Sequence, residues 1–102
     1  FPVEVRFTGP DDVWLSHSYG RESAYIAVHQ FAGSPYEPYF RAVEGVMDGF
    51  GGRPHWGKRH FQTAETLAPR YPEWDRFQAV RRRLDPEGVF ANDYVRRVLG
   101  AS

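Results

Sequence analysis

A ten-residue stretch in the middle of the chain, Gly51–His60, places the strongest constraint on the fold. It holds three glycines and a proline, which favour irregular backbone, together with two histidines, a tryptophan and three cationic residues. Pro54 fixes its own φ and biases Arg53 toward an extended shape, so we expect a stiffened loop that presents the side chains after it. This composition is typical of a functional site and not of a linker.

Trp56 and Lys58 leave two interpretations of this loop. A ring as large as that of Trp56 needs a surface to pack against, and Lys58 would then lie near the same surface, where loss of solvent tunes its charge. The other interpretation is a basic, solvated loop whose Trp56 plugs the core. Residue chemistry alone gives the two equal weight.

A first strand is predicted at Val3–Thr8, because apolar and polar residues alternate there with a period of two. Glu4 and Arg6 then project from the same side of the strand. They form either a surface ion pair, which contributes little to stability, or the lining of a pocket in which their charges orient substrate oxygens and hydroxyls.

A second strand is predicted at Ser23–Phe31. Tyr25, Ala27 and His29 share one of its faces, and apolar residues occur on both, so we expect both faces to be covered. A histidine in such a strand is more often a hydrogen-bonded interior residue than a catalyst.

The rest of the chain is predicted to be mainly helical. A helix over about Pro35–Asp48 is indicated because Ser34 and Glu37 have the spacing of a capping box. Three further helices are expected. The first is Thr63–Leu67, ended by Pro69 and Pro72; the second starts at Pro72 with the apolar stripe Trp74, Phe77, Val80 (or the stem of Arg81) and Leu84; and the last is capped by Asn92.

The predicted fold class is therefore α+β. A small antiparallel sheet is covered on one face by the helix over Pro35–Asp48, with the C-terminal helices packing beside it. Two strands make a poor sheet, so we expect further strands from another part of the protein or from a second copy.

Length and composition indicate a single domain, residues 1–102, with a modest core. Aromatic residues make up 17% of the chain, more than so small a core needs, so some rings are expected to cover a ligand cavity or a neighbouring part of the protein. The chain begins with Phe1, and no signal-peptide pattern precedes its first strand, so we expect a piece of a larger protein.

Charge and cysteine content exclude several function classes. Lys plus Arg and Asp plus Glu number 13 each, so no net field favours nucleic acid. The chain has no cysteine, which excludes a disulfide scaffold, thiol catalysis and Cys-ligated zinc. A reducing, cytoplasmic location fits this composition, and peripheral association with a membrane stays open as an alternative.

Motifs of other enzyme classes are missing. His55 and His60 are five positions apart and no His-Glu-x-x-His string occurs, which argues against a metal site. No Gly-x-Ser-x-Gly, P-loop or Gly-x-Gly-x-x-Gly string is present, so hydrolase, nucleotide triphosphatase and dinucleotide-binding interpretations have no support.

The chain carries a series of short strings in a fixed order: Glu4-Val-Arg6-Phe7, Asp11-Asp12 with Leu15-Ser16, Arg21-Glu-Ser-Ala-Tyr25, Gly51-Gly-Arg-Pro-His-Trp-Gly-Lys-Arg-His60, Arg70-Tyr-Pro72, Leu84-Asp-Pro-Glu-Gly-Val-Phe90 and Asn92-Asp-Tyr94. Together they resemble the C-terminal end of the aldonolactone oxidases. These are the D-arabinono-1,4-lactone and L-gulono-1,4-lactone oxidases, with the alditol oxidases as near relatives, in the vanillyl-alcohol oxidase group of flavoproteins. The resemblance covers nearly the whole chain, and its central string is specific.

The resemblance implies the substrate-binding (cap) part of an FAD-dependent oxidoreductase that oxidises a sugar lactone or a polyol by hydride transfer to flavin N5. It implies catalytic roles for Glu4, Arg6, His29 and Lys58. The first two would bind substrate hydroxyls, His29 would accept or relay a proton, and Lys58 would lie near the reacting oxygen or flavin N1. His55 joins these four in substrate binding, and Trp56, Lys58 and Asn92 are assigned to the cofactor. The histidine on the second strand occurs in alditol-oxidase-like relatives, but the animal gulonolactone enzymes lack it.

In the family, FAD is held mainly by an N-terminal domain, often covalently through a His, and that region is absent from this chain. The resemblance therefore implies that the isolated chain binds no flavin and is inactive. Its expected partners are the FAD-binding domain of the same parent chain and a sugar lactone or polyol substrate. Self-association through sheet edges and a non-catalytic α+β protein-interaction domain remain as alternatives.

Overall fold

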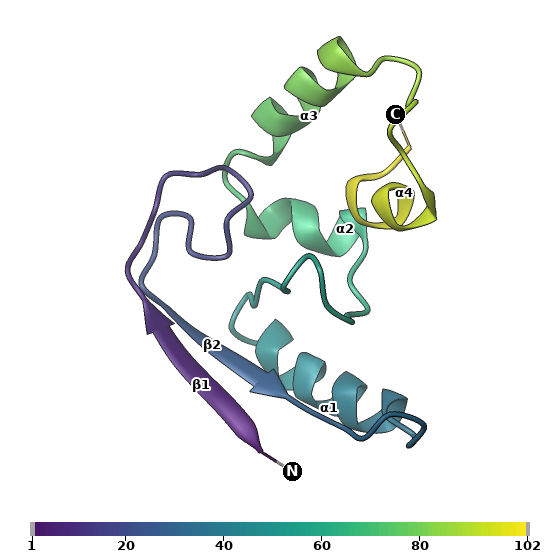
Figure 1. The fold of residues 1–102 in the computed structure, drawn as a ribbon. Coiled ribbons are helices and arrows are strands. Elements are labelled where there is room, and N and C mark those ends of the chain that lie inside the picture. Colours follow the sequence, from purple (N-terminus) through teal and green to yellow (C-terminus); the bar gives the residue numbers. More distant parts are fainter. Residues whose placement is uncertain (1, 102) are drawn as a thin grey trace. The chain divides into compact units, whose positions relative to one another are not determined.

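The computed structural model describes residues 2–101, which form two compact units. The first unit contains the residues up to Asp12 and Ser16–Phe61, and it holds the strands and the first helix. The second unit contains Val13–Leu15 and the residues from Gln62 onward, and it holds the remaining helices. Strands come first in the chain and helices follow, which confirms the α+β class (Figure 1).

The sheet of the first unit pairs β1 (Val3–Thr8) with β2 (Ser23–Val28) in antiparallel order, as predicted (Figure 1). Val3 lies opposite Val28 at one end of the sheet, and Thr8 lies opposite Ser23 at the other. Because neighbouring side chains alternate between faces, this register places Glu4, Arg6, Tyr25 and Ala27 on one face.

The predicted end of the second strand at Phe31 is wrong, because β2 stops at Val28. Beyond Val28 the backbone no longer pairs with β1, and the side chain of Gln30 forms local hydrogen bonds. Its amide donates to the Pro35 carbonyl at 3.2 Å and accepts from the Phe31 N–H at 3.3 Å. His29 therefore follows the strand and is exposed.

The helix of the first unit, α1, spans Glu37–Asp48 and so begins later than the predicted Pro35. The predicted capping box is also wrong: Tyr36 is the N-cap residue, and its side chain accepts no capping hydrogen bond. Ser34 instead closes a turn, its N–H donating to the Phe31 carbonyl at 3.0 Å. The helix ends where predicted, with Gly49 as its C-cap.

One face of the sheet is open to solvent. Most of its apolar side chains stay exposed, Phe7 to 80%, and Val28 is half-buried. The exposed ones are Val3, Val5, Phe7 and Ile26. The opposite face is partly covered, since Tyr25 and Ala27 are half-buried. No residue of α1 is buried, so the helix closes neither face into a core and the predicted cover is incomplete.

The second unit is built from α2 (Ala64–Leu67), the 3₁₀ helix η1 (Ala68–Arg70), α3 (Trp74–Leu84) and α4 (Asp93–Leu99) (Figure 1). Its buried apolar side chains are Leu67, Tyr71, Trp74 and Val98. The short helix predicted to reach Leu67 ends there, and Pro69 lies in the 3₁₀ helix that follows. The predicted place of Leu84 in the apolar stripe of α3 is wrong, because its side chain is exposed.

The last helix begins as predicted, because the Asn92 side-chain oxygen accepts a hydrogen bond from the Val95 N–H at 2.9 Å. Its other end is held by α3: the guanidinium of Arg81 donates to the carbonyls of Leu99 at 3.1 Å and Gly100 at 3.0 Å. These bonds satisfy carbonyls that a helix end leaves unpaired. Within residues 2–101, no helix is long and apolar enough to cross a membrane.

Replacing Asn92 by Ala should destabilise the protein by about 1 kcal/mol, the usual cost of losing an N-cap side chain. Chemical denaturation of the two proteins would measure the difference, and Asn92→Ser, which restores a capping oxygen, should recover most of it. Equal unfolding midpoints for Asn92→Ala and the parent would show that the cap contributes nothing.

Candidate functional site

Glu4 and Arg6 form an ion pair on the face of β1 that also carries Tyr25. The Arg6 Nε lies 2.6 Å from Glu4 Oε1, and both side chains remain largely exposed. The prediction that the two residues project from the same side is confirmed. Their hydrogen-bonding groups are paired with each other but still reach solvent, so they remain accessible to a polar ligand.

A chain of hydroxyl groups links this face to the connection between the strands. Tyr25 and Ser18 form a short hydrogen bond through their hydroxyls, and Ser18 Oγ lies 2.7 Å from Thr8 Oγ1. Ser18 is buried, although most serines lie on the surface. The connection is therefore fixed against the sheet from both strands.

The first half of the central loop is tied to the same connection. Arg21 donates to the Gly51 carbonyl at 3.1 Å, and Arg53 donates through Nη1 to the carbonyls of His17 at 3.2 Å and Tyr19 at 2.8 Å. Gly51 has a φ of 63°, which favours glycine. The loop is therefore held by hydrogen bonds to backbone carbonyls that no strand or helix pairs.

The second half of the loop is tied to α1. Arg59 donates to the Tyr36 hydroxyl at 2.8 Å, with its guanidinium 4.5 Å from the centre of that ring. The Phe61 N–H donates to the Glu44 carboxylate at 3.0 Å, and the guanidinium of Arg41 lies 3.9 Å from the centre of the Phe61 ring. The loop is thus held at both ends by side-chain contacts, which favours the stiffened loop that the sequence predicts.

A tight turn between these anchors presents Lys58. The Lys58 N–H donates to the His55 carbonyl at 3.0 Å, and the Gly57 N–H donates to Nδ1 of the same histidine at 3.0 Å. A Cβ at Gly57 would lie 3.3 Å from His55 Cε1, so a larger residue would crowd this turn. Nδ1 of His55 is an acceptor here, which places the proton of the neutral ring on Nε2.

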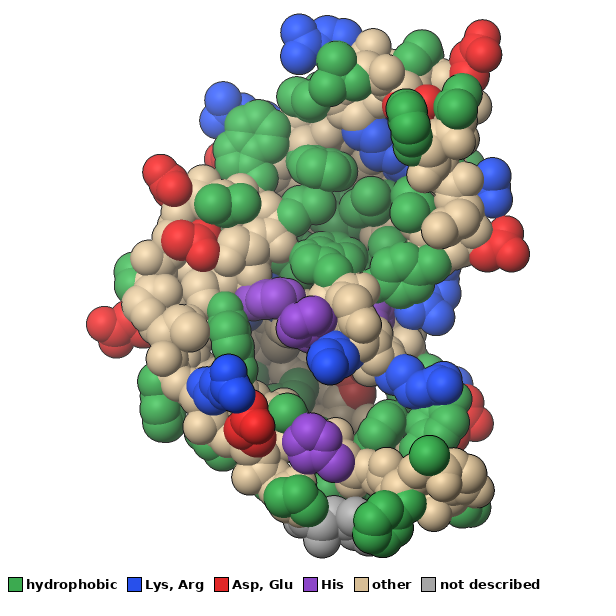
Figure 2. Space-filling view, viewed as in Figure 1, with side chains coloured by type: hydrophobic (Ala, Val, Ile, Leu, Met, Phe, Trp, Pro, Cys, Tyr) green, Lys and Arg blue, Asp and Glu red, His purple; other side chains and the backbone are tan. Residues whose placement is uncertain are grey.

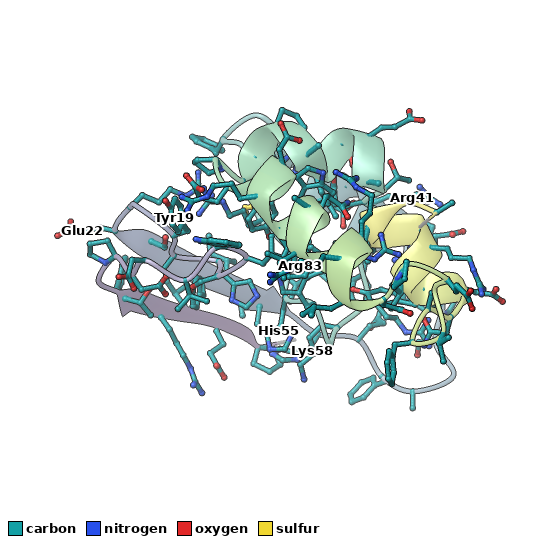
Figure 3. All side chains as sticks on the ribbon, turned by 90° about the horizontal axis from the view of Figure 1, so that it is seen from above. Tyr19, Glu22, Arg41, His55, Lys58 and Arg83 are labelled. Carbon is teal, nitrogen blue, oxygen red and sulfur yellow. The ribbon has the colours of Figure 1, made fainter. Side chains whose placement is uncertain are left out.

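Lys58 itself is exposed, and among residues 2–101 no side chain pairs with its ammonium group. The prediction that loss of solvent tunes its charge is therefore not supported in this chain by itself. Trp56 is half-buried, and this burial does not decide between the two interpretations of the loop. Figure 3 shows His55 and Lys58 extending from the same loop.

The structure reveals one residue that the sequence analysis missed. The His17 ring stacks on that of His55, with centroids 5.3 Å apart and an interplanar angle of 29°, and meets the Tyr25 ring edge-on at 5.5 Å. Its Nε2 is buried and has no hydrogen-bond partner among the described residues. His17 therefore links the central loop to the sheet face that carries Arg6.

The environment of His17 lowers its pKa below 6.5. Burial is the largest cause, followed by repulsion from His55 and Arg53, while Asp11 raises the pKa by a smaller amount. The folded protein therefore binds fewer protons at His17 than the unfolded chain does near pH 6. Its contribution to stability is complete above the unfolded pKa of 6.5 and is lost as the pH falls through the lowered folded value.

Stability should accordingly fall as the pH drops below about 6.5, and part of this fall should disappear in His17→Phe, which keeps a ring but cannot be protonated. Denaturation midpoints measured from pH 7.5 to 5 would show it. Parallel pH profiles for the two proteins would contradict the role given to the buried imidazole.

The first unit thus brings together Glu4, Arg6, His55 and Lys58 through the rings of His17 and Tyr25. Figure 2 shows a hollow in the surface with His, Lys or Arg, and acidic side chains around it. Asn92 lies in the second unit and serves as a helix cap, so its predicted cofactor role stays a prediction. Within residues 2–101, no group of three or more His, Cys, Asp or Glu side chains is placed to hold a metal ion.

Comparisons with known proteins cover almost the whole chain. A family model described as D-arabinono-1,4-lactone oxidase matches residues 1–98. L-gulono-1,4-lactone dehydrogenase from Mycobacterium tuberculosis is 69% identical over 98% of the chain. L-gulonolactone oxidase from Bos taurus is 41% identical over 96% of the chain, and alditol oxidase from a Streptomyces species is 40% identical over 94%. The chain spans 23% of the length of each of these relatives.

Proposed function

The chain belongs to the D-arabinono-1,4-lactone oxidase family, and from this premise we propose that it is the substrate-binding part of an FAD-dependent oxidoreductase. The proposed substrate is a sugar lactone (an aldono-1,4-lactone) or a polyol. The relatives carry names of lactone dehydrogenases and oxidases and of an alditol oxidase, which supports this substrate class. In the proposed arrangement, the parent protein supplies the FAD-binding domain.

The observation that carries the proposal is the exposed Glu4–Arg6 pair on the sheet face of Tyr25. The Tyr25 ring contacts His17, and His17 stacks on His55 of the loop that carries Lys58. A carboxylate accepts hydrogen bonds from sugar hydroxyls, and a guanidinium donates to ring and lactone oxygens in a planar fork. Held 2.6 Å apart, the two groups offer a donor and an acceptor side by side, which matches the alternating hydroxyls of a sugar.

The residues of the first unit fit the reacting end of a flavin better than its nucleotide end. Lys58 and Arg6 are accessible cations, suited to an electron-rich ring system, whereas no phosphate-cradling glycine loop occurs in the sequence. FAD, when bound, supplies the acceptor for a hydride from the substrate carbon. Lys58 and Trp56 would face it from the central loop, and the predicted cofactor role of Asn92, a residue of the second unit, stays a prediction.

Lys58 is proposed to offset the negative charge that develops on the reacting oxygen as that oxygen loses its proton and the carbon bonded to it gives up a hydride. Its ammonium group is free of protein partners among the described residues, so it needs no rearrangement before it acts. The Nε2–H of His55 is a second donor from the same turn and is proposed to bind a substrate oxygen. His29, exposed beyond β2, is proposed to accept or relay the proton.

The exposed apolar face of β1 and β2 favours a covering partner. We propose that the FAD-binding part of the parent protein, or further strands that it supplies, covers this face. If the chain were instead a non-catalytic interaction domain, a protein partner would cover this face, but that role would not require the free Lys58 on an anchored loop. Self-association through the two open sheet edges is the competing route.

The test is to purify the full-length protein and the isolated chain in parallel and to add L-gulono-1,4-lactone or an alditol under anaerobic conditions. We expect the full-length protein to contain bound FAD, and we expect the visible absorbance of that FAD to be lost when substrate is added. The isolated chain is expected to carry no flavin and to oxidise nothing. A full-length protein that holds no flavin, or whose flavin no lactone or alditol reduces, would sink the proposal.

A further inference from the structure

His17 occupies the junction between the three parts of the first unit that carry the proposed site. Its backbone carbonyl receives Arg53 from the central loop at 3.2 Å, and its ring contacts the rings of His55 in that loop and Tyr25 in β2. It offers no exposed Nε2 to a substrate, because that atom is buried. His17 is thus placed to support other residues and not to contact a ligand through Nε2.

The turn after His55 depends on the orientation of the His55 ring. Both the carbonyl and Nδ1 of His55 accept backbone N–H groups, from Lys58 and Gly57 respectively, each at 3.0 Å. A rotation of the His55 ring breaks the bond to Gly57 and releases the backbone that carries Lys58. The His17 ring, which stacks on His55, opposes this rotation.

Building on the proposed function, we propose that His17 is a positioning residue: its neutral ring, stacked on His55, holds the turn from which Lys58 is presented to the substrate. His17 acts through His55 and Lys58 and takes no part in proton or hydride transfer. Protonation of His17 places a cation against its neighbours and loosens the stack, so the turn is expected to be ordered at neutral pH and to open under acidic conditions.

The charges that face His17 come from each element packed against it. His55 and Arg53 of the central loop oppose its protonation, and Asp11 of its own connection favours it. Tyr25 of β2 presents a ring edge, while its hydroxyl bonds to Ser18. Burial and the two neighbours that oppose protonation outweigh Asp11, so the surroundings favour the neutral ring of His17, which is the form that stacks without repulsion.

Two substitutions in the full-length, FAD-loaded protein separate ring contact from protonation. His17→Ala removes the ring and should lower kcat about tenfold at pH 7.5 with little change in KM, the scale expected for loss of an aromatic contact. His17→Phe keeps a ring and should restore kcat at that pH. It should also move the acidic limb of the kcat profile to lower pH, which a purely structural role would not do. Asp12→Asn, an exposed change in the same connection, is the matched control and should leave both unchanged.

A second measurement does not depend on turnover. Hydrogen exchange of peptides that cover residues 55–58, corrected for intrinsic rate, should rise in the parent protein between pH 7.5 and 5.5, and the rise should be absent in His17→Phe. In His17→Ala the same peptides should exchange fast at both pH values. Peptides from α3 should not respond in any of these proteins.

The positioning role would be overturned if His17→Ala left both kcat and hydrogen exchange unchanged. It would also be overturned if His17→Phe had the same acidic limb of the kcat profile and the same exchange profile as the parent protein. The proposed function fails separately. If Lys58→Met and Arg6→Lys keep parental kinetics while exchange at 55–58 still follows His17, the site assignment is wrong and the structural coupling stands.

Discussion

Replacing Lys58 by Met in the full-length, FAD-loaded protein is expected to lower kcat about a hundred- to a thousandfold with little effect on KM. The proposed ammonium group acts on charge that develops only during the reaction, so its loss raises the barrier and leaves substrate binding nearly intact. Loss of a preorganised electrostatic partner costs roughly 2.7–4 kcal/mol in comparable sites. Steady-state kinetics with saturating lactone would measure the change.

Lys58→Arg is the matched control, because it keeps the positive charge but changes its geometry. It should retain more activity than Lys58→Met and less than the parent. Parental kcat in a folded, flavin-loaded Lys58→Met protein would show that the loop is scaffold. In that case Trp56→Ala would be expected to lower stability without any specific effect on turnover.

Arg6→Lys is expected to lower kcat/KM about ten- to a hundredfold, the scale of one or two charge-assisted hydrogen bonds to the substrate. A lysine keeps the charge but cannot reproduce the planar fork of donors that the guanidinium presents from β1. Measurement of kcat/KM for lactones and alditols of different length would show whether the loss depends on the substrate hydroxyls.

Glu4→Gln provides the internal check on Arg6. The two side chains are in contact at 2.6 Å, so the effects of Glu4→Gln and Arg6→Lys should be non-additive in the double variant. The rival interpretation treats the pair as a solvated ion pair, worth at most about 1 kcal/mol. It is supported if both single variants keep parental kcat/KM and differ from the parent only slightly in stability.

The strand and helix positions that local patterns control were predictable from the sequence. Alternation over Val3–Thr8 defines β1, and the short polar side chain of Asn92 marks the start of α4 by its capping chemistry. Arg81 lies in the last turn of α3, but its hydrogen bonds to the carbonyls at the end of α4 are not visible in the sequence.

The errors come from places where a local pattern competes with pairing between distant segments. Residues beyond Val28 continue the alternating pattern, but β1 offers them no paired residue, so the strand ends and His29 leaves the sheet. Ser34 and Glu37 have the spacing of a capping box, yet Ser34 is used in the preceding turn and the helix begins after Tyr36.

His17 could not be predicted because its importance arises only from the folded loop. Its neighbour His55 is far away in the sequence, and the two rings meet because Arg53 bonds to the carbonyls of His17 and Tyr19. The sequence does show a histidine between two serines in the segment that joins the two strands. Neither spacing nor periodicity links such a residue to a distant loop.

The measurement that tests the central claim most directly is the rate of flavin reduction in a single anaerobic turnover with L-gulono-1,4-lactone or an alditol. It isolates the step to which Lys58, Glu4 and Arg6 are proposed to contribute. The account predicts full reduction in the parent protein and a rate at least about a hundredfold lower in Lys58→Met, with similar substrate affinity. Equal reduction rates in the parent and Lys58→Met, or no reduction by any lactone or alditol, would contradict it.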